Sequence, residues 1–141
     1  MGTNSPTRIT VEAVVKAPLE KVWKYWNEPE HLTHWSFASN DWHAPSATND
    51  LRPGGKLIVR MEAKDGSFGF DFGGIYDVVK EHEEISFTMG DGRRVDIVFT
   101  PQGDATKVTE TFDAESTHPL DFQQAGWQSI LDNFKQYAEQ H

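Results

Sequence analysis

The sequence predicts an α+β protein in which one strand, two short helices, several antiparallel strands and one long helix follow one another. Two observations predict this class. Apolar and polar residues alternate through most of the chain, as in half-buried strands, and turn signals separate the alternating stretches. After residue 120, apolar residues recur every three or four positions, as in a helix. We expect residues 8–140 to form a single domain and residues 1–7 to be a flexible tail.

The first fifty residues are expected to hold one strand and both short helices. Residues 8–15 alternate and predict the strand. Pro18 suits the start of a helix, and residues 19–26 carry apolar side chains at helical spacing. Residues 30–35 predict a second, very short helix, and the polar stretch 36–50 is expected to be irregular.

The middle of the chain predicts consecutive hairpins. Asp65-Gly66 and Asp91-Gly92 are two-residue turn signals between alternating stretches, so the sheet is expected to be antiparallel. In the strand predicted over residues 67–80, Tyr76 and Val78 are expected to share one face. The predicted strands cover residues 56–64, 67–80, 85–89, 95–99 and 105–113.

The C-terminal stretch has a different period. From Phe122 to Ala138, apolar residues form one broad face over about five helical turns. Pro119 and Asp121 stand where the start of a helix favours a proline and an acid. This is the long helix of the predicted order.

Composition excludes several classes of protein. The formal net charge is −9, which disfavours binding to phosphate backbones and anionic lipid, so we expect no nucleic acid and no membrane insertion. The chain has no cysteine, which excludes disulfides, thiolate zinc sites and cysteine nucleophiles. No apolar run approaches the ~20 residues that span a bilayer. Cytoplasmic residence is the resulting expectation.

Short segments in a fixed order resemble a known fold family. They include APLEKVW at 17–23, PEHLTHW at 29–35, RPGG at 52–55, GIYDVV at 74–79, EISFT at 84–88, and VFTP with TKVT between 98 and 109. The set resembles the helix-grip fold of the START and birch-allergen-like superfamily, abbreviated SRPBCC. Within it, the resemblance is to AHSA-type single-domain proteins, which are similar to the C-terminal domain of the activator of the heat-shock-chaperone ATPase.

The resemblance implies a curved antiparallel sheet wrapped around the C-terminal helix. A strongly curved sheet leaves a gap over a straight helix, and such gaps fall in the usual ligand-cavity range of ~300–1,000 Å³. Members of this superfamily bind apolar small molecules, catalyse cyclisations or dock onto a chaperone, so the fold alone does not select the function.

Thirteen residues, most of them aromatic, are the candidates for lining such a cavity. The alternative is that these side chains fill the core themselves. Trp35, Phe37 and Trp42 are expected near the mouth and are the most exposed to a ligand. The full set is Trp35, Phe37, Trp42, Met61, Phe68, Phe70, Phe72, Tyr76, Phe87, Phe99, Trp127, Ile130 and Phe134.

Two histidines on the second short helix raise the question of a metal. His31 and His34 lie three positions apart, and a metal site would need further ligands, for which His43 and His118 are the only nearby candidates by type. No His-Glu-x-x-His pattern occurs and nothing in the spacing joins these residues. Solvent-exposed helix polarity is the simpler interpretation, so we expect neither a metal nor another cofactor.

Glu110 is the one candidate for acid–base chemistry. It shares its parity with Val108 and Phe112, so strict alternation points its carboxyl group inward. An apolar environment raises the pKa of a carboxyl group and suits it to proton transfer. The alternatives are a bulge that returns Glu110 to water, or a structural pair with Arg93, which shares the parity of the inward residue Val95.

Three functions remain open from the sequence. The first is a binding module that holds an apolar or aromatic small molecule between sheet and helix. The second is an interaction protein of chaperone or stress physiology, with a heat-shock chaperone as partner. The third is an enzyme acting on a hydrophobic substrate with Glu110 as its acid, and we favour a protein that is not an enzyme.

Overall fold

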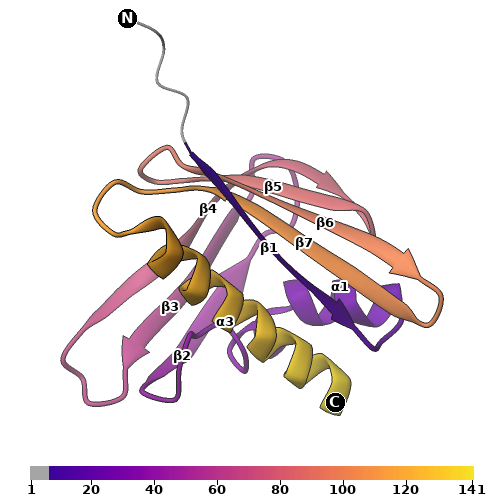
Figure 1. Ribbon diagram of the computed structural model, residues 1–141, viewed down its shortest axis with the longest axis horizontal. Coiled ribbons are helices and arrows are strands. Elements are labelled where there is room, and N and C mark those ends of the chain that lie inside the picture. The colour runs from indigo at the N-terminus through magenta and orange to yellow at the C-terminus, as the bar shows by residue number, and fades with distance from the viewer. Residues whose placement is uncertain (1–6) are drawn as a thin grey trace, which may run out of the picture.

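A computed structural model describes residues 7–141 and confirms the α+β class (Figure 1). One strand is followed by two short helices, six further strands and a long helix over these residues. In chain order the elements are β1 (Arg8–Val15), α1 (Leu19–Asn27), α2 (Pro29–Leu32), β2 (Trp42–Asn49), β3 (Lys56–Ala63), β4 (Gly69–Lys80), β5 (Glu84–Met89), β6 (Arg94–Gln102), β7 (Ala105–Asp113) and α3 (Leu120–Gln140).

The strands form one curled antiparallel sheet in the order β1-β7-β6-β5-β4-β3-β2. From β2 to β7, every strand pairs with its neighbour in the chain, as consecutive hairpins require. β1 instead pairs with β7 at the far edge. The segment between β1 and β2, which contains α1 and α2, therefore crosses from one edge of the sheet to the other.

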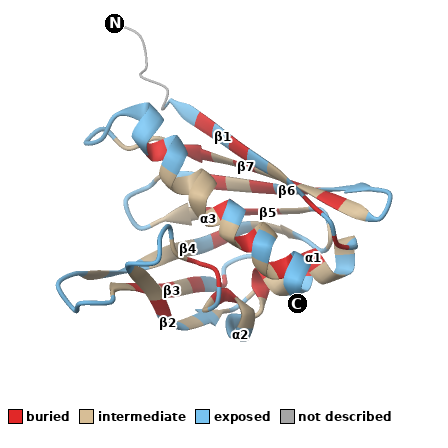
Figure 2. Ribbon diagram, turned by 60° about the horizontal axis from the view of Figure 1, so that its bottom comes forward, coloured by how far each residue is buried: buried red, intermediate tan, exposed pale blue. Residues whose placement is uncertain are grey.

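Helix α3 lies across the concave face of the sheet and packs most closely on β1 (Figure 1). Figure 2 shows a buried stripe along α3 and exposed residues on its outer side. Leu131, Phe134 and Ala138 belong to this stripe and are fully buried, so the apolar period of the sequence corresponds to the face that covers the sheet. None of the helices within residues 7–141 combines the length and the apolar composition that spanning a bilayer requires.

The irregular stretch expected over residues 36–50 is partly wrong, because β2 occupies Trp42–Asn49. This strand lies at the edge of the sheet and pairs only with β3, with a bulge between His43 and Ser46. An edge strand exposes polar residues and tolerates proline, here Pro45, so it lacks the alternation that reveals an inner strand.

Two further boundaries differ from the sequence prediction. Helix α2 ends at Leu32 rather than at residue 35. In β4 a bulge between Tyr76 and Val78 inserts one residue, so Val79 rather than Val78 packs against the core with Tyr76. The predicted flexible tail lies outside the described residues except for Thr7, whose carbonyl accepts a hydrogen bond from the Ala114 N–H at 2.7 Å.

Candidate functional site

A cavity of about 510 Å³ lies between the concave face of the sheet and α3. Most of its lining is apolar, and it lies within the size range of small-molecule sites. Strands β3, β4 and β5 contribute most of the strand residues of the walls, and Trp26 of α1 and the segment that follows α2 form the closed end. The lining residues are Trp26, Trp35, Ser36, Leu57, Val59, Met61, Phe70, Asp71, Phe72, Gly73, Phe87, Met89, Gly90, Asp91, Arg93, Ile97, Glu110, Trp127 and Ile130.

The cavity opens where two neighbouring strands differ in length. The pairing of β4 with β5 begins at Gly74 and Met89, so residues 69–73 of β4 extend beyond the end of β5. The exposed lining residues lie at this gap: Phe70 and Asp71 on β4, with Gly90 and Asp91 in the turn after β5. The mouth is therefore framed by the start of β4 and the turn between β5 and β6.

The opposite end is closed by aromatic rings. The ring centroids of Trp26 of α1 and Trp35 are 4.7 Å apart. Both rings pack edge-on against Phe134 of α3, with centroid distances of 4.8 Å. Phe99 packs edge-on against Trp26 at 5.9 Å and against Trp23 at 5.2 Å. Edge-to-face packing of this kind fills space between the helices and the sheet, so the cavity ends here.

The structure brings seven of the thirteen candidates to the cavity: Trp35, Met61, Phe70, Phe72, Phe87, Trp127 and Ile130. Within this group, Trp127 stacks on Phe112 at 3.9 Å and meets Phe72 edge-on at 5.6 Å. These contacts hold the Trp127 ring at the cavity wall. The other six candidates are absent from the lining: Phe37, Trp42, Phe68, Tyr76, Phe99 and Phe134.

The three residues expected near the mouth lie in different places. Trp35 is buried at the closed end, and neither Phe37 nor Trp42 lines the cavity. Trp42 instead packs with Phe68 and Phe70 on the hairpin between β3 and β4, with ring centroids 5.8–6.2 Å apart. Trp42 is therefore a neighbour of the mouth residue Phe70 without lining the cavity itself, whereas Trp35 lies at the opposite end.

Tyr76 has a structural role that its sequence position does not reveal. Its hydroxyl donates a hydrogen bond to Asn49 Oδ1 at 2.6 Å, and Asn49 Nδ2 donates to the carbonyl of Asn27 at 2.8 Å. This chain connects β4, β2 and the end of α1. It holds the closed end in place rather than contributing to the cavity surface.

Several lining residues were not among the candidates. Leu57 and Val59 share the face of Met61 on β3, so alternation alone could have identified them. Ile97 lies directly opposite Glu110 in the pairing of β6 with β7. Gly90 and Asp91 lie in a turn, where no periodic signal exists, and only the end of β5 places them at the mouth.

Glu110 points into the cavity, as strict alternation predicts. Its side chain is nine-tenths buried, and burial raises the pKa of its carboxyl group to about 8. No residue among 7–141 forms a hydrogen bond or an ion pair with this carboxyl group. The alternative of a structural pair with Arg93 is not formed, because Arg93 Nε lies 2.7 Å from Asp91 Oδ2 at the mouth.

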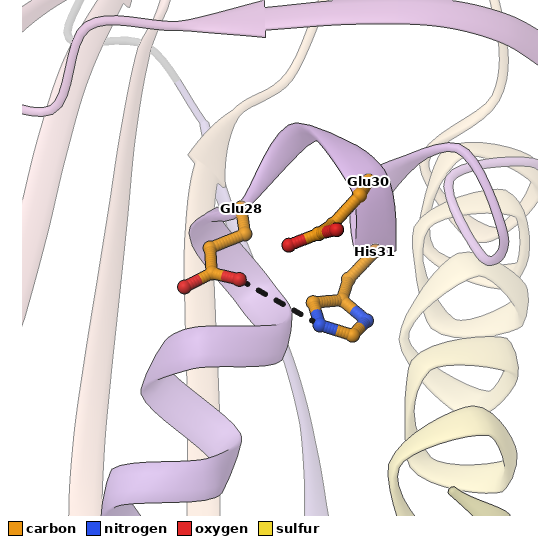
Figure 3. A group of neighbouring side chains, drawn as sticks. All are labelled: Glu28, Glu30 and His31. Atoms are coloured by element: carbon orange, nitrogen blue, oxygen red, sulfur yellow. Dashed lines mark ion pairs between the residues drawn. The ribbon is translucent and has the colours of Figure 1, made fainter.

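A second polar cluster lies away from the cavity, at the junction of α1 and α2 (Figure 3). Its members are Glu28, Glu30 and His31, whose ligating atoms lie within 4.8 Å of one another. His31 stacks on Tyr25 at 4.0 Å, and its Nδ1 forms a hydrogen bond of 2.6 Å with the hydroxyl of Tyr137. These contacts connect α2 to α3 and explain the position of His31 without a metal.

The remaining histidines do not join this cluster. His34 is exposed and stacks on the ring of Tyr137 at 5.6 Å. His43 on β2 lies 3.8 Å from Glu62, and His118 contacts Glu115 before α3. The expectation of solvent-exposed polarity therefore fits His34 and is wrong for His31, which the two tyrosine rings cover.

A curled antiparallel sheet that holds a long C-terminal helix, with a cavity between them, defines a helix-grip protein of the SRPBCC superfamily. Residues 16–139 match the family described as Activator of Hsp90 ATPase homolog 1-like protein. The match covers most of the chain, so the protein belongs to the AHSA1-like family. The resemblance found in the sequence is thereby confirmed.

Solved structures agree with this assignment. The AHSA1-like protein from Aeromonas hydrophila is 47% identical, with 95% of this chain and 93% of that chain covered and a TM-score of 0.89. Chr148 from Cytophaga hutchinsonii is 56% identical, with 94% and 92% covered and a TM-score of 0.82. Protein NE0264 from Nitrosomonas europaea, at 18% identity and a TM-score of 0.82, shares the fold. A search of curated proteins found no match.

Proposed function

We propose that the protein is an intracellular binding module that holds an apolar or aromatic small molecule in the cavity between the sheet and α3. The observation that carries the proposal is the cavity itself, of about 510 Å³ with a largely apolar lining and a mouth at the end of β5. Cavities of this size and composition are typical of small-molecule sites. Apolar surface left open to water favours an occupant that removes it from water.

Binding of an uncharged, environment-sensitive dye such as Nile red tests the proposal. We expect saturable binding by the folded protein with one dye per chain. Met61→Trp places a large ring on the cavity wall, since Met61 is buried and lines the cavity. We expect this variant to weaken dye binding at least tenfold, measured by fluorescence titration.

Val98→Trp is the matched control for this experiment. Val98 is an exposed residue of β6, so the same ring is added on the outer face of the sheet. We expect dye affinity within about twofold of the unsubstituted protein. Equal loss of binding in both variants, or no saturable binding by the native protein, would contradict the proposed cavity function.

The second candidate is an interaction protein with a heat-shock chaperone as partner, which the family description suggests. The observation in its favour is an aromatic cluster that Trp42 at the start of β2 forms with two exposed rings at the start of β4, Phe68 and Phe70. Phe68 is 61% exposed there, and exposed aromatic groups are typical of interaction surfaces. Absence of dye binding would favour this candidate over the first.

A further inference from the structure

Glu110 is the unusual group in a cavity that is otherwise largely apolar. Its neighbours across the sheet are Val11 on β1 and Ile97 on β6, and both are buried and apolar. Helix α3 contributes Trp127 and Ile130 to the same cavity. Few water molecules can reach a carboxyl group buried this deeply, and no residue among 7–141 offers it a hydrogen bond, which is a costly position for a polar group.

The other charged residues that line the cavity lie at the mouth and already have partners. Arg93 pairs with Asp91, at 2.7 Å between Nε and Oδ2. Asp71 Oδ1 lies 3.5 Å from a guanidinium nitrogen of Arg60, on the neighbouring strand. Among the charged groups of the lining in residues 7–141, Glu110 alone therefore lacks a counter-ion.

We propose, on the basis of the cavity function above, that the ligand is an apolar molecule carrying one basic amine, and that Glu110 is the counter-ion of its ammonium group. The apolar part of the ligand contacts the ring-lined walls. The ammonium group supplies both the charge and the hydrogen-bond donors that the protein does not provide to Glu110. An acidic ligand is disfavoured, because the one cation of the lining in residues 7–141, Arg93, already pairs with Asp91.

Such binding has a proton balance that distinguishes it. Because the pKa of Glu110 is about 8, the carboxyl group of the free protein is mostly protonated at pH 7. Pairing with an ammonium group requires the carboxylate, so one O–H bond of Glu110 breaks and its proton passes to the buffer. We expect release of about 0.9 proton per ligand at pH 7, and affinity that rises about tenfold from pH 6 to pH 7.

Two probes that share a ring system and differ in the head group test the inference. 1-Naphthylmethylamine and 1-naphthylmethanol are titrated against the full chain by calorimetry at pH 6, 7 and 8. We expect the amine to bind at least tenfold more tightly than the alcohol at pH 8, while the affinity of the alcohol does not change with pH. Repeating the amine titration in two buffers of different ionisation enthalpy measures the released proton on the unsubstituted protein.

Glu110→Gln keeps the shape of the side chain and removes its charge. We expect this variant to bind the amine at least tenfold more weakly and the alcohol within threefold of the unsubstituted protein. Glu12→Gln is the matched control, since Glu12 is an exposed acid on the neighbouring strand β1. It should leave both affinities unchanged.

The outcomes separate the two proposals. Equal binding of amine and alcohol without proton release overturns the role of Glu110 and leaves the cavity function standing. A preference for the amine that persists in Glu110→Gln also overturns it. Failure of both probes and of Nile red to bind overturns the cavity function itself. The proton-release measurement needs no variant, so it decides the question even if Glu110→Gln folds poorly.

Discussion

The two ends of the space between sheet and α3 use the same kind of residue in different ways. At the closed end, the rings of Trp26, Trp35 and Phe134 pack on one another with centroid distances of 4.7–4.8 Å, and they fill the space between α3 and the sheet. Toward the mouth, Phe72 and Trp127 meet edge-on at 5.6 Å and stand at the border of an open cavity. Aromatic composition is similar at both ends, so it does not decide whether a cavity exists.

The rings fill space at one end and border a cavity at the other because different elements cover the two ends. Helices α1 and α2 cover the closed end, and hydrogen bonds from Tyr76 through Asn49 to Asn27 hold α1 against the sheet. At the other end β5 stops at Met89 while β4 continues to the hairpin, so no strand covers the gap. Cavity formation here follows from strand length and connection, and the rings adapt to it.

The largest expected effect is on stability at the closed end. Phe134 is fully buried between two tryptophan rings, so Phe134→Ala should lower the free energy of unfolding by about 3–5 kcal/mol. Phe72→Ala at the cavity wall should cost less, about 1–2 kcal/mol, because Phe72 is only half-buried and borders open space. Urea unfolding followed by circular dichroism measures both, and equal losses would contradict the contrast between the ends.

A smaller effect concerns the pH dependence of stability. Between the unfolded pKa of 4.5 and the folded pKa of about 8, folded Glu110 keeps a proton that the unfolded chain releases. The free energy of unfolding therefore falls as pH rises through this window. Each pH unit contributes about 1.4 kcal/mol, which gives a decline of roughly 3 kcal/mol between pH 4.5 and pH 7.

Glu110→Gln should remove this decline, and Glu12→Gln, which changes an exposed acid, should keep it. Urea unfolding at pH 5, 6, 7 and 8 measures the profiles. Carbon-detected NMR of the Glu110 carboxyl group gives the folded pKa directly. A pKa near the ordinary 4.5 would show that water reaches Glu110 and that the cavity is wetter than its lining suggests.

The smallest of the three effects concerns the mouth. Gly73 has a φ of +146°, and a Cβ atom there would lie 1.9 Å from the Leu57 carbonyl oxygen on β3. Gly73→Ala should therefore cost about 2 kcal/mol and disturb the pairing of β3 with β4. Gly90 also lines the mouth but has open space around a Cβ, so Gly90→Ala should change stability by less than about 0.5 kcal/mol. Thermal unfolding measures the loss of stability in both variants. Equal losses in Gly73→Ala and Gly90→Ala would indicate that the backbone of β4 follows a different path.

Much of the fold was predictable from local pattern alone. Alternation located β1 and the strands from β3 to β7, and the period of three to four located α3 and its buried face. The inward direction of Glu110 followed from the same alternation, because no bulge interrupts β7. The curvature of the sheet was predicted from the resemblance to the helix-grip family, because the alternation of apolar and polar residues says nothing about curvature.

Other features depended on contacts between distant residues. Strand β2 is polar because it lies at an edge, and an edge position is a property of the whole sheet. Strand alternation would have let the Arg93 side chain point inward toward Glu110. Arg93 instead forms an ion pair with Asp91, two residues earlier in the chain. An ion pair between residues two positions apart costs little conformational entropy. It therefore forms in preference to an ion pair across the cavity.

Away from the bulges, the sequence by itself determined which residues face inward, because side-chain direction is a local property of strand and helix geometry. Only the tertiary structure decided which of those residues meet open space. Phe134 and Phe72 both face the core, but one lies beneath α1 and α2 and the other beside the gap beyond β5. Whether a buried ring fills or lines a cavity depends on elements that are distant in the chain, and their placement is encoded in no single segment.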